Sequence, residues 1–479
     1  MHFSIPDTQE YSEGNSNYTG YNLHVNGVFH CSLRYSQLHD FNEQIKKEFG
    51  TGFIGAQKFP PKKILSLNQQ HIEERRQKLE KYIQLVSQDQ RVANSDLFNG
   101  FLLSAQKETR KEKPVEAKLD VFLMNGHKIT VNIMSMDQTD DVLEAVASEI
   151  GLKSDLVFYF ALFLVKKDED DERGTIVRRL QDFESPFISL KSAAGKNKIV
   201  LRKNYWDASY DDDLIADSVG LQLLYVQVVN DIERGWVQAT PDQVKRLETL
   251  KSKGSRKDYL QFARTLKDYG FIQFKPCVVD YPAINTPAVV SAGNRELTFR
   301  LRLENGACKE GSFKITRMRC WRITSVKEGE DSKVDPSQLE LAFEYLIGKE
   351  KLRWIVITSD QAILMSLCLQ DMVDELLLFK RGGRIKRPHD RVKGPERQFK
   401  GRDGGVIVAS STSSPAIDPH LPPQSPSDTS PTKTSKAMGS VKKISDKLQS
   451  VSVSAKQHHA PMSVVENDIF EAGIGEDDL

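Results

Sequence analysis

Three basic side chains and one aromatic side chain occur close together near the start of the chain. Arg34 and Tyr35 are adjacent, Lys62 follows the Pro-Pro pair at 60–61, and Arg75 comes next. A forked guanidinium matches the oxygens of a phosphate, and an ammonium group acts as a nearby point charge. A flat ring can lie beneath another ring. These residue types suit a phosphorylated ring compound, although each cation taken alone could be an ordinary surface residue.

The flanking sequence predicts the elements that hold these residues. Two segments that alternate apolar and polar residues flank Asn26-Gly27, a pair that favours a tight hairpin turn. Apolar residues at helical spacing then predict one helix that ends at Gly50 and a second helix around Arg75. Residues 1–108 are therefore predicted to form strands, a helix, a Pro-rich loop and another helix.

This first unit resembles the phox-homology (PX) domain, the phosphoinositide-binding domain of sorting nexins. The resemblance is carried by the Arg-Tyr pair, the Pro-Pro-Lys loop and an Arg-x-x-x-Leu-Glu-x-Tyr pattern that begins at Arg75. It implies that Arg34 holds the 3-phosphate of phosphatidylinositol 3-phosphate and that Tyr35 stacks beneath the inositol ring. It further implies that Lys62 meets the 1-phosphate and that Arg75 bonds the 4- and 5-hydroxyls.

Three further units are predicted beyond a short charged linker. Residues 115–203 show a hairpin, helix, strand, strand order, which indicates a ubiquitin-like lobe, and residues 204–270 have helical spacing throughout. Residues 271–388 contain seven candidate strands and one amphipathic helix, which predicts a sandwich of the phosphotyrosine-binding or pleckstrin type. Residues 389–479 are predicted to form a disordered tail that ends in a partner-binding peptide, because residues 403 to about 463 are rich in Ser, Thr and Pro and poor in apolar residues. The fold class is α+β and multidomain.

The order of these lobes is that of a FERM module, and the whole chain resembles the PX-FERM sorting nexins. Matching segments include Tyr-Trp-Asp at 205–207, Asp-Ile-Glu-Arg-Gly-Trp at 231–236 and Arg-Met-Arg-Cys-Trp-Arg at 317–322. The resemblance implies a cytoplasmic adaptor, peripheral on early endosome membranes. Such an adaptor binds Asn-Pro-x-Tyr and Asn-x-x-Tyr signals in receptor tails and directs the receptors away from lysosomal degradation into recycling to the plasma membrane.

A peptide site is expected in the predicted sandwich. An extended peptide can add as a strand at an exposed sheet edge, in a groove beside the final helix. The resemblance assigns two residues to this peptide, Trp321 on the strand beside the groove and Leu378 on the helix. Without the resemblance, an aromatic residue on a strand would more simply belong to the core.

The end of the chain carries a second expected partner site. Apolar and acidic residues return there after the long polar stretch. The resemblance implies that this peptide recruits the retriever recycling complex, whereas composition alone also allows a frayed end. The residues assigned to the coat-recruiting tail are Ile474, Gly475, Asp477, Asp478 and Leu479.

Whole-chain totals restrict the remaining function classes. Lys and Arg number 67 against 66 Asp and Glu, so a net charge of +1 provides no bulk attraction to nucleic acid. Five cysteines without a Cys-x-x-Cys pair favour buried thiols over a disulfide framework or a zinc site. The common phosphate-loop, zinc-protease and serine-hydrolase motifs are absent from the sequence. We therefore expect a monomer that is not an enzyme and uses no cofactor or metal.

Two alternatives remain open at this level. A FERM-type scaffold could link the membrane to the cytoskeleton or to a small GTPase. The basic run from Lys380 to Arg402 could form an RNA-binding, nuclear-import or membrane-binding strip, although we interpret it as a solvated run that ends the last domain. No nucleic acid is expected as a partner, because Phe399 is the only aromatic residue in this run.

Overall fold

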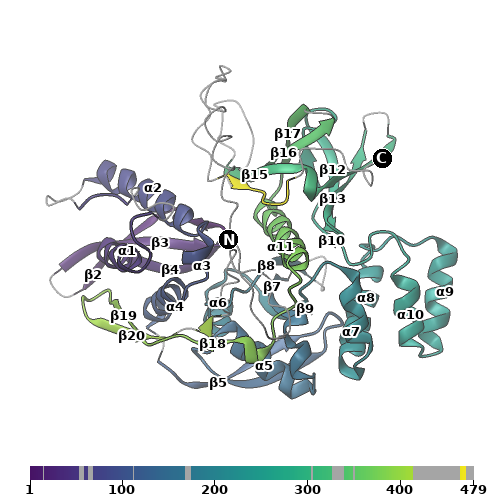
Figure 1. The fold of residues 1–479 in the computed structure, drawn as a ribbon, viewed down its shortest axis with the longest axis horizontal. Coiled ribbons are helices and arrows are strands. Elements are labelled where there is room, and N and C mark those ends of the chain that lie inside the picture. Colours follow the sequence, from purple (N-terminus) through teal and green to yellow (C-terminus); the bar gives the residue numbers. More distant parts are fainter. Residues whose placement is uncertain are drawn as a thin grey trace, which may run out of the picture.

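The computed structural model describes residues 1–13, 16–52, 59–62, 68–111, 113–167, 174–303, 306–325, 339–348, 351–410, 412–413 and 464–470. Buried apolar side chains in these ranges form three cores. One lies in the N-terminal unit, the second is shared by the ubiquitin-like and helical lobes, and the third fills the sandwich. Figure 1 shows the N-terminal unit and the helical lobe at opposite ends of the molecule.

The N-terminal unit combines one antiparallel sheet with four helices. Strand β3 pairs with β1, β2 and β4, and the turn between β3 and β4 is formed by Asn26 and Gly27 at φ 51° and 80°. Both residues tolerate positive φ, which explains the predicted hairpin. The elements are β1 (Phe3–Ser4), β2 (Thr8–Glu13), β3 (Ser16–Val25), β4 (Val28–Arg34), α1 (Tyr35–Phe49), α2 (Gln69–Val86), α3 (Gln90–Ala93) and α4 (Asp96–Arg110).

The ubiquitin-like lobe is a five-stranded sheet in the order β6-β5-β9-β7-β8. In β6 the side chains alternate strictly between exposed and buried, as expected for a strand with one face on the core. The elements are β5 (Glu116–Phe122), β6 (Lys128–Met134), α5 (Thr139–Ile150), η1 (Ser154–Tyr159), β7 (Phe160–Lys166), β8 (Thr175–Arg179), α6 (Pro186–Ser192) and β9 (Asn197–Lys203).

The helical lobe follows directly and packs on the same core. Asp211 is fully buried and accepts hydrogen bonds from the hydroxyls of Tyr205 at 2.5 Å and Tyr269 at 2.7 Å, so its carboxylate joins the two ends of the lobe. The acidic run at 211–213 forms the first turn of α7 (Asp211–Ile215). The elements are η2 (Ala208–Tyr210), α7 (Asp211–Ile215), α8 (Ser218–Glu233), α9 (Pro241–Ser252) and α10 (Arg256–Ala263).

The sandwich is a highly twisted antiparallel sheet closed by one long helix. Its strand order is β14-β13-β12-β11-β17-β16-β15-β22, with β10 paired to β12. Helix α11 packs against β12, β15 and β16. The elements are β10 (Ile272–Gln273), β11 (Cys277–Val279), β12 (Thr286–Gly293), β13 (Glu296–Arg302), β14 (Cys308–Lys314), η3 (Ile315–Arg317), β15 (Met318–Ser325), β16 (Leu339–Gly348), β17 (Lys351–Thr358) and α11 (Ala362–Lys380).

The predicted tail from residue 389 begins too early. The chain continues in ordered structure to residue 413, and a further segment at 464–470 returns to the sandwich. The rest of the predicted tail lies outside the described residues. The additional elements are η4 (Pro388–Asp390), β18 (Val392–Lys393), β19 (Arg397–Lys400), β20 (Val406–Ala409), β21 (Thr412–Ser413) and β22 (Val465–Glu466).

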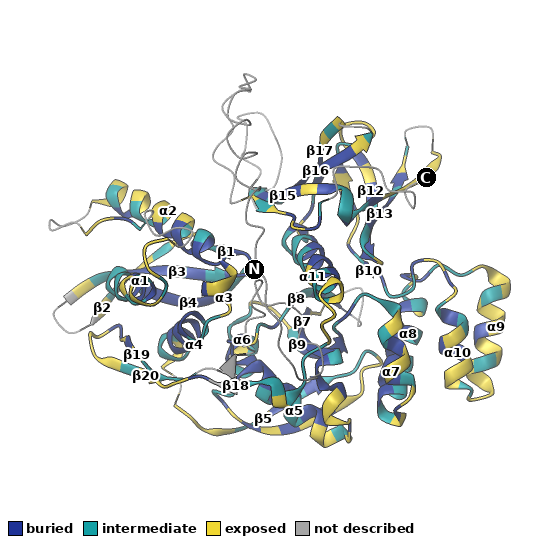
Figure 2. Cartoon of the chain, in the orientation of Figure 1, coloured by how far each residue is buried: buried dark blue, intermediate teal, exposed yellow. Residues whose placement is uncertain are grey.

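The N-terminal unit is joined to the ubiquitin-like lobe by buried polar contacts. The Gln106 side-chain amide donates to the Ser189 hydroxyl at 2.9 Å and accepts from the Ser185 backbone N–H at 2.8 Å. Phe183 of the ubiquitin-like lobe belongs to the core of the N-terminal unit. Figure 2 shows buried residues along this junction, while the outer faces of α2 and α9 are exposed. The N-terminal unit and the ubiquitin-like lobe are therefore packed directly against each other.

His30 at this interface predicts a pH-dependent stability. Its ring is buried against Phe183 and its Nε2 lies 3.0 Å from the Leu102 carbonyl oxygen. Burial lowers the pKa of His30 to about 4, with the Glu184 carboxylate opposing and the Arg178 guanidinium adding to this shift. Below its ordinary pKa of 6.5 the unfolded chain therefore binds a proton that the folded chain does not, so His30 reduces stability as the pH falls from 6.5 to 4.

A His30→Gln variant should isolate this effect. Gln can still donate to the Leu102 carbonyl but does not titrate. We expect the stability advantage of the wild type over the variant to shrink by about 1.4 kcal/mol per pH unit between pH 6.5 and 4. Denaturant unfolding of both proteins across this range measures the difference. Parallel stability curves would contradict the assignment.

Candidate functional site

The four residues predicted to bind a phosphorylated ring lie on one strand, two helices and a loop. Arg34 is the last residue of β4 and Tyr35 begins α1, while Arg75 lies on α2. The Arg75 guanidinium is 4.3 Å from the centre of the Tyr35 ring, and the Tyr35 hydroxyl donates to the Pro60 carbonyl at 2.8 Å. Lys62 is exposed on the loop that this bond anchors. The Arg-Tyr pair, the Pro-Pro loop and α2 are thereby brought together.

Arg34 is held beside this group by two contacts. Its guanidinium carbon lies 4.0 Å from the centre of the Tyr18 ring, a distance typical of a cation–π contact. Its Nη1 donates to the backbone carbonyl of Arg402 at 2.7 Å, a residue 368 positions further along the chain. Arg34 is half-buried, so water screens its charge only in part and the guanidinium can still bind an anion.

Arg75 carries an unsatisfied buried donor. Its Nη2 is buried and makes no hydrogen bond of ordinary geometry, and the Tyr21 hydroxyl is buried beside it. Burial raises the pKa of Tyr21, whereas the charge of Arg75 and its polar contact with the hydroxyl lower it. Leaving such donors unpaired costs free energy unless a ligand supplies acceptors. The arrangement can therefore receive a polyhydroxylated or phosphorylated molecule.

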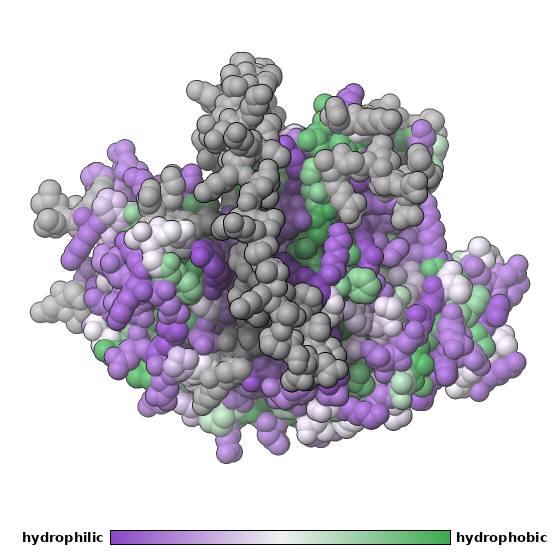
Figure 3. All heavy atoms as spheres, in the orientation of Figure 1, coloured by the Kyte–Doolittle hydropathy of each residue, from purple (hydrophilic) through white to green (hydrophobic). Residues whose placement is uncertain are grey.

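A second site lies at the exposed edge of the sandwich. Strand β15 is the last long strand of the sheet, and the short strand β22 from the C-terminal segment pairs with it antiparallel. The register pairs Trp321 with Val465 and Cys320 with Glu466. Figure 3 shows hydrophobic residues gathered over the sandwich, whereas most of this face is hydrophilic. The edge of β15 thus receives an extended peptide, here a segment of the same chain.

Asn467 ends this added strand and begins a turn. Its side-chain amide donates to the Ile315 carbonyl at 2.7 Å and to the Met318 carbonyl at 2.6 Å, and its oxygen accepts from the Ile469 N–H. The Phe470 N–H donates to the Asn467 carbonyl at 3.1 Å, which closes a four-residue β-turn. Residues 465–470 therefore have the form of strand, asparagine and turn.

Trp321 forms the floor of this edge. Its side chain is only 1% exposed, and its indole N–H donates to the Ser366 hydroxyl on α11 at 3.0 Å. The residue meets the added strand through backbone pairing with Val465. The side chain of Trp321 thus belongs to the core, and its backbone pairs with the tail segment; its contact with a cargo peptide stays a prediction.

Leu378 lies elsewhere on the helix. It is half-exposed near the C-terminal end of α11, 12 residues after Ser366, which places it ~18 Å along the helix axis. Its side chain lies close to Gly383, where an added Cβ would be 2.4 Å from the Leu378 Cδ1. Its neighbour Leu377 packs against the sandwich core. The described contacts do not bring Leu378 to the β22 strand.

The N-terminal unit also reaches the peptide edge. The Gln88 side-chain amide donates to the Val464 carbonyl at 3.4 Å. Met1 and Gln84 line a small space together with Val465 of the added strand and Gln370 of α11. Burial lowers the pKa of the Met1 amino group, while the carboxylates of Asp371 and Asp374 raise it. Residues that are far apart in the sequence thus lie together at the end of the paired strands β15 and β22.

The basic run after α11 is not a solvated run, so that prediction is wrong. We name residues 384–409 the strap, because this segment contacts first the ubiquitin-like lobe and then the N-terminal unit. Lys386 lies 2.9 Å from the carboxylates of both Asp140 and Asp182. Further along the strap, side chains pair with the ubiquitin-like lobe and with α1, at Arg391–Asp141 (2.8 Å), Arg391–Glu144 (2.5 Å) and Arg397–Glu48 (2.6 Å).

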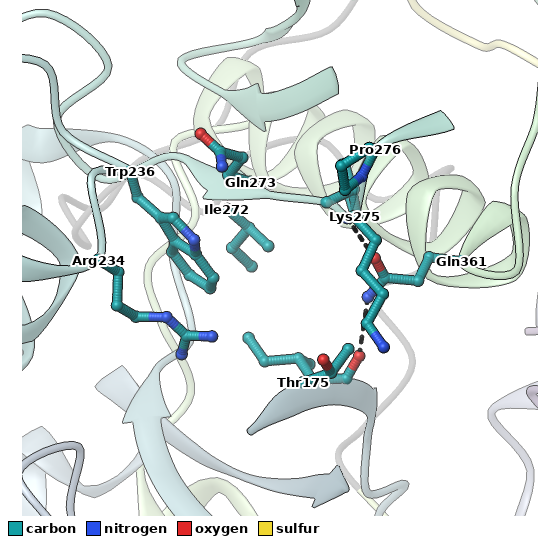
Figure 4. A pocket seen from close by; sticks show the side chains of 10 residues that line it. Thr175, Arg234, Trp236, Ile272, Gln273, Lys275, Pro276 and Gln361 are labelled. Carbon is teal, nitrogen blue, oxygen red and sulfur yellow. Dashed lines mark hydrogen bonds between the residues drawn. The ribbon is translucent and has the colours of Figure 1, made fainter. Parts of the chain in front are cut away.

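A cavity of about 230 Å³ lies where the ubiquitin-like lobe, the helical lobe and the sandwich meet. In Figure 4, Arg234 and Trp236 stand on one side and Lys275 and Gln361 on the other, with Thr175 below. The Gln361 amide oxygen accepts from the Lys275 N–H at 2.7 Å and its nitrogen donates to a β8 carbonyl at 3.2 Å. These bonds fix the sandwich against the ubiquitin-like lobe, away from both sites above.

Some predicted residues fall beyond what the structure describes. The coat-recruiting residues, Ile474 to Leu479, lie outside the described residues. Within the described ranges, no helix is long and apolar enough to cross a membrane. In the same ranges, no group of three or more His, Cys, Asp or Glu residues could hold a metal ion.

Sequence reasoning missed the tail segment at β15, although a signal was present. The tail contains Asn467, followed three residues later by the aromatic Phe470 and preceded by Val465. This is the Asn-x-x-aromatic pattern expected of a bound cargo peptide. A search of the tail for an Asn-x-x-aromatic sequence would therefore have located this segment.

Comparison with known proteins places all four units in one family. Family models match at residues 21–105 (PX domain), 117–206 (sorting nexin 17/27/31, FERM domain, F1 lobe), 207–267 (sorting nexin 17/31, FERM domain, F2 lobe) and 270–377 (sorting nexin 17 FERM C-terminal domain).

Full-length relatives agree with the family models. The chain is 46% identical over 492 residues to sorting nexin-17 of Danio rerio and of Homo sapiens, covering 100% of each chain. It is 37% identical over 385 residues to sorting nexin-31 of Homo sapiens, covering 79% of this chain and 86% of that one. The chain therefore belongs to the PX-FERM sorting nexin family, as its motifs predict.

Proposed function

We propose that this protein is an endosomal sorting adaptor that joins phosphatidylinositol 3-phosphate, receptor tails and a recycling coat. Its PX domain binds the lipid, and the β15 edge binds Asn-Pro-x-Tyr or Asn-x-x-Tyr signals. Its C-terminal residues recruit a retriever-type complex, so that receptors return to the plasma membrane. The observation that supports the proposal most strongly is the strand-and-turn segment 465–470 on β15, because it has the shape of such a signal.

The chemistry of the lipid site supports the first part. Arg34 and Arg75 each stack on a tyrosine and keep donors for a ligand, and Arg75 has a buried Nη2 without a partner. Guanidinium groups bond phosphate and hydroxyl oxygens through forked donors. Lys62, exposed on the neighbouring loop, supplies a point charge near the membrane-facing phosphate.

The geometry of Asn467 supports the second part. Its side-chain amide donates hydrogen bonds to two backbone carbonyls, those of Ile315 and Met318. A side chain without an amide donor at this peptide position would leave both carbonyls unpaired. The turn after it suits Pro at the next position, because Pro is favoured at the second residue of such turns. An Asn-Pro-x-Tyr segment therefore fits the same edge as residues 467–470.

Calorimetric titration of the full chain with an Asn-Pro-x-Tyr peptide tests the cargo part. Replacing the peptide Asn by Ala should weaken binding by about tenfold or more, since two buried carbonyls lose their donors. A peptide with Pro replaced by Ala is the matched control and should lose less. Equal affinity of the Asn and Ala peptides would contradict the assignment of this edge.

The coat part rests on the last residues, Ile474 to Leu479. A chain that lacks Leu479 should fail to capture the retriever-type complex while still binding lipid and cargo peptide. Unchanged capture would exclude this role for the terminus. A FERM-type scaffold for the cytoskeleton or a small GTPase has no specific observation in its favour, so the adaptor remains the preferred function.

A further inference from the structure

The strap ends in a hairpin that is built into the surface of the PX domain. Strands β19 and β20 pair with each other and pack on α1 and α4. Phe399 on β19 is 2% exposed and lies in the PX core, with its ring 6.0 Å from that of Phe101. The Gln44 and Gln37 amides donate to backbone carbonyls of the hairpin at 3.0 and 3.2 Å. The hairpin is thus an integral layer of the domain.

Arg402, which follows β19, is the polar centre of this contact. Its side chain is 7% exposed, and its Nη2 donates to the Ser32 carbonyl at 2.8 Å and to the Thr109 hydroxyl at 2.9 Å. Its backbone N–H donates to the Glu108 carboxylate. These bonds reach both β4 and α4, so the position of the Arg402 backbone is fixed by the PX domain itself.

The carbonyl of Arg402 is the group that holds Arg34. It accepts from the Arg34 Nη1 at 2.7 Å, while the Tyr18 ring lies against the guanidinium at 4.0 Å. A free arginine side chain samples many rotamers, and ordering it on binding lowers affinity. The two contacts fix the rotamer before a ligand arrives. The contact with the Arg402 carbonyl comes from a residue beyond the FERM module.

We propose that the strap hairpin completes the phosphoinositide site, with Arg402 as the positioning residue for Arg34. The ligand is a phosphate monoester on an inositol ring, so the inference rests on the proposed lipid function. The same strap binds the ubiquitin-like lobe through Lys386 and Arg391. The lipid site therefore includes a segment that the FERM module holds in place, and residues 1–108 alone form an incomplete site.

The test uses the full chain and a soluble short-chain phosphatidylinositol 3-phosphate, titrated by calorimetry. Arg402→Gln should lose about five- to tenfold in affinity, because Arg34 must then be ordered during binding. Lys400→Gln removes the same charge from the same hairpin, but its side chain is exposed, and it should stay within about twofold of the wild type. Thr109→Val, which removes one anchor of Arg402, should lose about twofold.

A double-mutant cycle separates positioning from general loss of structure. Arg34→Lys keeps a cation but cannot be held in the same way, because an ammonium lacks the planar fork. In this background Arg402→Gln should change affinity by less than about twofold. Affinity for an Asn-Pro-x-Tyr peptide and the melting temperature of each variant report whether the chain remains folded.

Each result decides between distinct conclusions. If Arg402→Gln and Lys400→Gln bind alike, or if Arg402→Gln loses as much with Arg34→Lys as with Arg34, the positioning role is wrong. If the wild type binds neither the soluble lipid nor vesicles that contain it, the proposed lipid function itself fails. Parallel losses for soluble lipid and for vesicles assign the effect to the headgroup site, whereas a loss confined to vesicles would contradict the inference.

Discussion

Arg34→Gln should reduce the affinity of the protein for vesicles containing phosphatidylinositol 3-phosphate by about ten- to a hundredfold. Hydrogen bonds to a charged group contribute about 1.5–3 kcal/mol, and Gln can replace neither the charge nor the fork. Arg34 also lies at the junction of β4 and α1, where Tyr18 and Arg402 fix its direction. Vesicle co-sedimentation at constant salt measures the loss.

A matched control for this variant is Arg91→Gln. Arg91 lies in the same domain with a side chain that is 61% exposed and pairs with Asp89 next to it. The Asp89 carboxylate is buried, but the Arg91 guanidinium lies in water, where its charge is screened, so the control should bind vesicles as the wild type does. If Arg34→Gln also binds as the wild type, the phosphate is held by another residue.

Asn467→Ala should increase the affinity of the full chain for an Asn-Pro-x-Tyr peptide by about ten- to thirtyfold. The chain's own segment occupies the β15 edge, so a peptide must displace it. Removing the Asn467 amide deletes the bonds to Ile315 and Met318, each worth about 1 kcal/mol, and opens the edge. Calorimetric titration of wild type and variant with the same peptide measures the gain.

Two substitutions at Asp468 sharpen this prediction. Asp468 is exposed and follows Asn467 in the turn. Asp468→Ala should leave peptide affinity close to that of the wild type. Asp468→Pro should lower it by a few fold, because Pro at this turn position stabilises the tail segment in its bound form. An unchanged affinity in both Asn467→Ala and Asp468→Pro would mean that the segment does not occupy the edge in solution.

Local sequence signals predicted the elements that carry the four residues of the proposed lipid site. The positive φ values of Asn26 and Gly27 explain why that dipeptide marked a hairpin, and Gly50 at φ 75° ends α1 where the periodicity stopped. The family pattern assigned Arg75 and Tyr35 to one site, and the structure has the Arg75 guanidinium 4.3 Å from the centre of the Tyr35 ring. Such signals lie within a few residues of the structure they determine, so they can be read without knowing the rest of the fold.

The strap and the tail segment could not be read in this way. Arg391 pairs with Asp141 across 250 residues, and Arg402 meets Ser32 across 370. A basic run with interspersed Gly and Pro has the composition of a solvated segment, and its partners are visible only in three dimensions. Trp321 shows the same limit, since a strand residue can be buried by its side chain and still pair with a peptide through its backbone.

The adaptor function is tested most directly by asking whether the protein carries a cargo peptide to a membrane. A fluorescent Asn-Pro-x-Tyr peptide is mixed with the full chain and with vesicles that contain or lack phosphatidylinositol 3-phosphate, and the sedimented fluorescence is measured. The peptide should sediment only when protein and lipid are both present, and Arg34→Gln should abolish this without changing peptide affinity in solution. If the protein sediments with the lipid vesicles while the peptide stays in the supernatant, the account is contradicted.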